Sequence, residues 1–201
     1  MYLVSLVVHP LLMPTFLFLI IYFQAPIVLS PISEGSFRYL LFAIAITTCI
    51  IPLLSIISFK YSSMVGSIEL ENRRDRLGPF LFISIFYTIT AFMFGLNDNI
   101  NPLLTVIFAA MTVNVVLLAL ITLWFKVSVH AASVMGLVGM LVALAFKYPG
   151  SGLRVPVIYS FLIAGLVMTS RLYLNAHTPK EVGLGALVGF FVSWGGIMLF
   201  A

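Results

Sequence analysis

The sequence predicts an all-α protein, a polytopic bundle of six to seven transmembrane helices that forms a single integral-membrane domain over residues 1–201. Composition is the first reason, because 62% hydrophobic and 8% charged residues cannot make an ordinary water-facing surface. Length is the second, because a helix needs roughly 20 mainly apolar residues to cross the hydrocarbon layer, which leaves no room for a sizeable soluble domain. Pattern is the third, because residues 40–46 and 182–191 lack the alternation of a barrel strand.

Seven apolar segments are separated by clusters of Gly, Pro, Asn and charged residues, which are typical of loops. The first segment has no basic leader and no clear small-residue cleavage site, so we expect a retained helix rather than a signal peptide. Several segments are near the lower length limit for a span, which leaves six as well as seven helices open. The predicted spans are residues 2–23, 38–59, 79–96, 103–125, 131–146, 156–169 and 182–200.

Counting the spans places three polar clusters on one membrane face. Two helices separate the loop at 60–79 from Ser128, and two more separate Ser128 from Arg171, so all three clusters emerge on the same side. The net charge of +4 is carried by loops, which favours anionic head groups or an anionic substrate as partners over nucleic acid. Within the apolar segments, Asn114 predicts a hydrogen bond between helices, and Gly185 and Gly189 predict close helix packing.

The cluster at residues 170–181 combines a fixed cation, an imidazole and a carboxylate. Arg171 closes a span with a planar guanidinium that matches phosphate oxygens. Thr178 and Pro179 are typical of a helix start, which places His177 just outside a helix N-terminus, where anions are favoured. Glu181 has two interpretations that the spacing leaves open. It completes a capping box, or it orients the His177 ring for nucleophilic attack on phosphorus.

Two further clusters supply candidate partners for this chemistry. Ser128 is a predicted N-cap, and His130 then lies in the first turn of a helix, where it can act as a general acid. The loop at residues 69–79 carries the densest charge in the chain, and its arginines either pair with Glu69, Glu71 and Asp75 or clamp phosphate oxygens. The acidic residues also raise a metal site as a rival interpretation. We expect the remaining histidine, His9, to be structural.

These motifs resemble the type 2 phosphatidic acid phosphatases, integral-membrane lipid phosphatases related in fold to the vanadium haloperoxidases. The third motif of that family is Ser-Arg, five residues, His, three residues and Asp. The present chain has Ser170-Arg171, His177 and Glu181 at the same spacing, with Glu in place of Asp. The second motif, Pro-Ser-Gly-His, is represented by residues 127–130, which keep Ser128 and His130. The first, a lysine, six intervening residues and then Arg-Pro, is loosely matched by residues 73–79.

The resemblance implies a haloperoxidase-like helical core and a metal-independent site without a cofactor. His177 is then the nucleophile that forms a phosphohistidine, Glu181 orients it, and His130 protonates the leaving group. Arg171, Ser128 and either Arg73 or Arg76 are implied to bind the phosphate. The expected function is a lipid phosphatase acting on a phosphate or pyrophosphate monoester, with its site on the periplasmic face of the bacterial inner membrane.

Two alternatives stay open on the sequence. A phosphotransferase that passes the phosphoryl group from the histidine to another alcohol would carry the same residues. The other alternative is a non-enzymatic transporter or scaffold that binds anionic lipids with its arginines. Transport sites usually lie near the middle of the membrane, whereas the polar clusters of this chain lie at the ends of the spans. The sequence does not select the lipid, because the same group is present in phosphatidate, phosphatidylglycerol phosphate, polyprenyl pyrophosphate and lipid A-type phosphates. It does not select the oligomeric state either.

Overall fold

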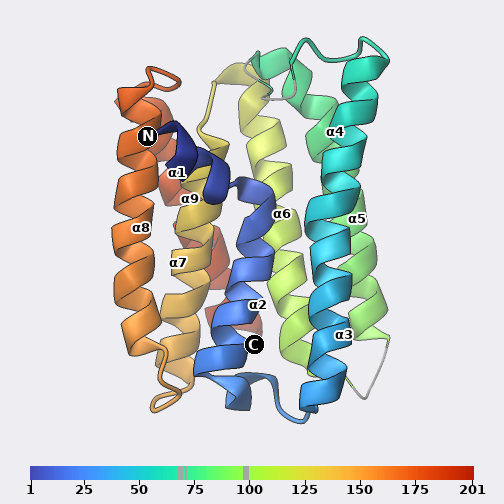
Figure 1. Cartoon of the computed structure of the whole chain (residues 1–201), viewed down its shortest axis with the longest axis vertical. Coiled ribbons are helices and arrows are strands. Elements are labelled where there is room, and N and C mark those ends of the chain that lie inside the picture. Colours follow the sequence, from blue (N-terminus) through green and yellow to red (C-terminus); the bar gives the residue numbers. More distant parts are fainter. Residues whose placement is uncertain (68–69, 71, 97–99) are drawn as a thin grey trace.

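The computed structural model describes residues 1–67, 70, 72–96 and 100–201, and helices are its only regular elements within those residues (Figure 1). Seven of its helical segments are long and apolar enough to cross a membrane, which confirms the predicted integral-membrane helix bundle and its count of seven spans. The helices are α1 (Tyr2–Val7), α2 (Met13–Gln24), α3 (Glu34–Ala45), α4 (Ile51–Tyr61), α5 (Leu77–Gly95), α6 (Pro102–Trp124), α7 (Val129–Lys147), α8 (Arg154–Tyr173) and α9 (Pro179–Phe200).

The first predicted span is broken rather than continuous. Its helix α1 ends at Val7, and α2 begins only after a short 3-10 turn at Pro10–Leu12. Pro10 has no N–H to donate and disfavours helical geometry at the residue before it, and His9 accordingly has extended backbone angles. Hydropathy does not detect this break because the residues on both sides of it are apolar. In Figure 1, α1 lies slanted across the upper end of the bundle.

The second predicted span is continuous and holds a wider turn in its middle. A π-helical turn at Ile46–Ile50 joins α3 to α4 two residues before Pro52. The missing N–H of that proline removes one α-helical hydrogen bond at this point, which accounts for the local change of pitch.

The centre of the bundle is α7, because 61% of its span is buried compared with 28% for α8 and for α9. Glycines on α9 let its backbone approach α7 closely. A Cβ atom at Gly185 would overlap the carbonyl oxygen of Ser128, and one at Gly189 would overlap that of Ala132. The predicted packing role of these two glycines is thereby confirmed.

A polar contact ties α6 to α9 inside the membrane region. The Nδ2 atom of Asn114 donates a hydrogen bond to Oγ of Ser193 over 2.8 Å, which confirms the predicted interhelical bond. An apolar cavity of about 110 Å³ lies beside this pair, between α2, α5, α6 and α7. Its lining reaches Val129 and Ser133 in the first turns of α7, so the cavity extends toward the end of the bundle that holds the polar clusters.

Candidate functional site

The three polar clusters meet at one end of the bundle, at the top of Figure 1, as the count of spans predicts. Hydrogen bonds to backbone oxygens join the loop at 60–79 to the segment before α7, and join that segment in turn to the one before α9. These bonds run from Arg76 Nη1 to Val127 O over 2.7 Å, from Lys126 Nζ to Ala176 O over 3.1 Å, and from Ser128 N to Glu181 O over 3.1 Å. Segments that lie far apart in the sequence therefore form one polar site.

His177 and Glu181 are a hydrogen-bonded pair at the start of α9. The Nδ1 atom of His177 lies 2.8 Å from Oε2 of Glu181, and both side chains are largely buried. The same Oε2 accepts the backbone N–H of Thr178 over 3.3 Å, and the Thr178 hydroxyl accepts the N–H of Glu181, which completes a capping box. The two interpretations of Glu181 are thus compatible: one carboxylate caps the helix and holds the imidazole.

Burial lowers the pKa of His177 to about 4. The hydrogen bond to Glu181 raises this pKa, but the nearby charges of Arg76, Lys126 and Arg171 lower it further. The imidazole is consequently neutral at neutral pH. Its Nδ1–H donates to the carboxylate, so the lone pair is on Nε2. His177 therefore combines an unprotonated Nε2 with the charges of three nearby cations.

We expect the imidazole NMR signals of His177 to titrate near pH 4 rather than near the ordinary value of 6.5, because the neutral form is the stable one in this site. Lys126→Met removes one of the cations that oppose protonation, so the titration midpoint should move to higher pH. Lys180→Met is the matched control, because Lys180 is exposed and its charge is not among those that act on His177. A midpoint near 6.5 in the unmodified protein would contradict the site geometry.

Two arginines of the loop at residues 69–79, Arg73 and Arg76, were predicted to bind phosphate, and Arg76 lies in the site. It is 4% exposed, and its Nε donates to the carbonyl of Leu70 over 2.8 Å. The side chain of Arg73 reaches the end of α6 instead, where its Nη1 donates to the carbonyl of Leu123 over 2.9 Å. Its charge is not among those that act on His177. Of the three acidic residues of the metal interpretation, Glu69 and Glu71 lie outside the described residues, and Oδ2 of Asp75 accepts the backbone N–H of Gly66 over 2.8 Å.

Arg171 is in the last turn of α8, within reach of the same site. The apolar segment ends at residue 169, and the helix continues through Ser170 and Arg171 to Tyr173, so Arg171 closes the span as the sequence predicts. Ser170 is buried, and its hydroxyl donates to the carbonyl of Met1 over 2.8 Å and accepts from the hydroxyl of Ser5, 3.0 Å away. Ser170 therefore anchors the end of α8, while the charge of Arg171 acts on His177.

Ser128 and His130 begin α7 as the sequence predicts. Ser128 is the N-cap, fully buried, with its Oγ accepting the N–H of Ala131 over 3.4 Å. His130 is half-buried, and its Nε2 lies 3.2 Å from the carbonyl oxygen of Ser5. Electrostatic interactions connect His130 with both Arg171 and His177, so the second and third motifs are brought together.

Three residues of this region were given no role in the site on the sequence, namely Lys126 of the Ser128 cluster, Ser5 and His9. Lys126 stands two residues before Ser128, and that proximity was the available signal. His9, which was expected to be structural, caps the turn at Pro10–Leu12 and also packs its ring edgewise against His130, with centroids 5.5 Å apart. The His9-Pro10 dipeptide signals a helix break, but nothing in the sequence indicates that the break turns Ser5 toward α7 and α8.

Within the part of the chain that the structure describes, no group of three His, Cys, Asp or Glu side chains is placed to hold a metal ion. Comparisons of the chain with models of protein families, with curated proteins and with solved structures give no match.

Proposed function

We propose that this integral-membrane protein is a lipid phosphatase that hydrolyses a phosphate or pyrophosphate monoester through a phosphohistidine intermediate. The observation that carries the proposal is the His177 pair: Nδ1 is held by Glu181 at 2.8 Å, and the charges of Arg76, Lys126 and Arg171 act on the ring. Such an arrangement leaves Nε2 as a nucleophile and supplies positive charge where a phosphate must bind. The family resemblance at Ser170-Arg171, His177 and Glu181 supports the same chemistry.

In the proposed first step, the Nε2 lone pair of His177 attacks phosphorus and the bond from phosphorus to the ester oxygen breaks. His130, in its doubly protonated form, gives its Nδ1 proton to the departing oxygen while Nε2–H stays on the Ser5 carbonyl, so that a lipid alcohol leaves, or a lipid phosphate in the case of a pyrophosphate. In the second step, water attacks the phosphohistidine and returns a proton to His130. The phosphorus–nitrogen bond then breaks, inorganic phosphate leaves, and His177 recovers its lone pair.

The charges of the site suit this reaction. A phosphoryl group in transfer carries negative charge on its equatorial oxygens, and fixed cations in a water-poor site stabilise it strongly. Arg76 and Arg171 are permanently charged, and Arg76 is held in place by two backbone carbonyls. The start of α7 at Ser128 adds backbone N–H groups that favour an anion. The apolar cavity beside the first turns of α7 supports an amphiphilic substrate rather than a soluble phosphate ester.

Phosphate release from detergent-solubilised protein tests the proposal. The substrates are phosphatidate, phosphatidylglycerol phosphate, a polyprenyl pyrophosphate and a lipid A-type phosphate, each with EDTA present. We expect release from at least one of them, unchanged by the chelator, because the proposed steps use only side chains. Acid-labile phosphate on the protein after a rapid quench would report the phosphohistidine.

The outcomes separate the alternatives. Release that an added alcohol acceptor converts into phosphoryl transfer would identify a phosphotransferase with the same intermediate. No release from any lipid phosphate would contradict the enzyme proposal and leave an anionic-lipid-binding scaffold or transporter.

The membrane orientation that the resemblance implies, with the site on the periplasmic side of a bacterial inner membrane, is part of the proposal. Lys180→Cys places a thiol at an exposed position beside the site. A membrane-impermeant thiol reagent should label this variant in intact cells, because the reagent reaches only the periplasmic side. Labelling that requires broken cells would place the site on the cytoplasmic side instead.

A further inference from the structure

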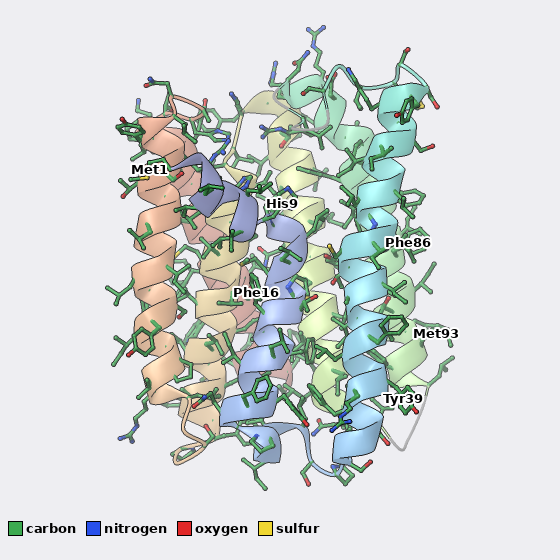
Figure 2. The ribbon with its side chains drawn as sticks, in the orientation of Figure 1. Met1, His9, Phe16, Tyr39, Phe86 and Met93 are labelled. Atoms are coloured by element: carbon green, nitrogen blue, oxygen red, sulfur yellow. The ribbon has the colours of Figure 1, made fainter. Side chains whose placement is uncertain are left out.

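The last turn of α1 and the two residues after it cross the end of the bundle that holds the site. We call residues 5–9 the N-terminal crossover. It exists because the helix breaks before Pro10, which turns α1 away from the axis of α2 and places it against α8. Figure 2 labels His9 where the chain passes from α1 to α2. A straight first span would have carried Ser5 along the axis of α2, away from the start of α7.

Ser5 contacts two of the motifs at once. Its carbonyl oxygen lies 3.2 Å from Nε2 of His130, and its hydroxyl lies 3.0 Å from the hydroxyl of Ser170. A carbonyl oxygen can only accept, so Nε2 of His130 carries the proton in this bond, and Nδ1 holds the lone pair when the ring is neutral. The Ser5 carbonyl therefore does for His130 what the Glu181 carboxylate does for His177: it selects one tautomer and orients the ring.

His9 adds a third imidazole with a defined tautomer. Its Nδ1 accepts the backbone N–H of Leu11 over 3.3 Å, which caps the turn at Pro10–Leu12 and leaves the proton of the neutral ring on Nε2. Among the described residues, the structure gives this Nε2–H no hydrogen-bond acceptor. The ring lies edgewise on His130 and interacts electrostatically with Arg171. His9 therefore stands on the His130 side of the site.

A membrane-facing groove leads to the same place. It has a volume of about 510 Å³ and runs between α2 and α8 across α7, with a mainly apolar lining that includes Phe16, Leu137 and Ile163. Val7 and Val8, which stand directly before His9, close its upper end. In a bilayer this groove accommodates hydrocarbon. A lipid whose chain lies there presents the oxygen that joins chain to phosphate at the crossover, with the phosphate farther in toward His177.

We propose that the N-terminal crossover forms the leaving-group side of the site, with Ser5 as a positioning residue for His130 and the Nε2–H of His9 as a hydrogen-bond donor to the departing ester oxygen. His9 keeps its proton throughout, and His130 alone transfers one. The inference rests on the proposed phosphatase function and adds how the lipid alcohol is recognised. It assigns to His9 a role that a helix cap alone does not require.

His9→Ser tests this role, because serine retains the N-cap acceptor for Leu11 but cannot reach the leaving oxygen. The two substrates carry the same hydrocarbon chain, and one is an alkyl phosphate and the other a nitrophenyl phosphate. An alkoxide needs hydrogen bonding and protonation to leave, whereas a nitrophenolate leaves without them. We expect kcat/KM to fall by about 100- to 1,000-fold for the alkyl phosphate, the scale of a lost transition-state donor, and to stay near the wild-type value for the nitrophenyl phosphate.

Ser33→Ala is the matched control, because it removes the N-cap of α3 at the opposite end of the bundle. It should leave both kcat/KM values unchanged. Equal losses on the two substrates for His9→Ser, or no loss on the alkyl phosphate, would overturn the leaving-group assignment while the phosphatase stands. If the wild-type protein releases phosphate from neither substrate nor from the lipid panel, the proposed function fails, and this inference fails with it.

Discussion

Replacing His177 with alanine is expected to abolish phosphate release while the bundle stays folded. The change removes the proposed nucleophile, and losses of this kind in covalent enzymes are on the order of 10³-fold or more in kcat. Folding should survive because Thr178 and Glu181 still form the capping box of α9 without the imidazole. The measurements are phosphate release from the preferred lipid phosphate, acid-labile phosphate on the protein, and thermal unfolding in detergent.

Lys180→Ala is the control for this variant. Lys180 is exposed in the first turn of the same helix, and its charge is not among those that act on His177. We expect wild-type turnover and labelling from it. Turnover by His177→Ala close to that of the wild type would rule out the phosphohistidine mechanism. Loss of turnover with retained phosphate labelling would move the nucleophile to another residue, with His130 the next to examine.

Gly189→Ala is expected to produce the largest loss of stability from a single added methyl group. A Cβ at this position would overlap the carbonyl oxygen of Ala132, which is helix backbone and cannot rotate away. Helices α7 and α9 must then separate, and overpacking of this kind costs about 1–3 kcal/mol. The hydrogen bond from Ser128 N to Glu181 O connects the starts of the same two helices, so phosphate release should fall together with the unfolding temperature.

Gly183→Ala provides the comparison on the same helix. None of the described residues beyond its own helix turn and chain neighbours comes within 4 Å of a Cβ at Gly183, so the methyl group meets open space. Alanine is favoured over glycine in a helix by roughly 0.5–1 kcal/mol, and this variant should be as stable as the wild type or slightly more so. Equal unfolding temperatures for the two variants would contradict the close contact between α7 and α9.

Much of the fold could be predicted because its determinants are local or set by the membrane. The hydrocarbon layer requires long apolar segments, so composition and pattern identify the seven spans. The break at His9 escaped prediction because Pro10 is flanked by apolar residues, and a hydropathy pattern records no change there. At the end of α8, Arg171 lies in the last turn as predicted, but the hydrogen bonds of Ser170 with Met1 and Ser5 depend on that same break and could not be predicted.

The candidate site likewise contains local contacts that the sequence predicts and long-range contacts that it does not. His177, Thr178 and Glu181 lie within five positions, so their capping box and hydrogen bond follow from helix geometry and could be anticipated from spacing. Spacing could not show which of Arg73 and Arg76 lies in the site. That depends on which guanidinium contacts Val127, which is 51 residues farther along the chain than Arg76. Lys126 likewise acquires its place only through Ala176.

Sequence alone was sufficient for the membrane class, the spans and the local pairing of His177 with Glu181, since each depends on hydrophobicity or on contacts within one helical turn. Tertiary structure decided which residues surround that histidine. The glycine contacts of α9 with α7 bring the second and third motifs together, and the bend at Pro10 places Ser5 against His130, 125 residues away. Contacts of that separation arise from the packing of whole helices, and no local pattern encodes them.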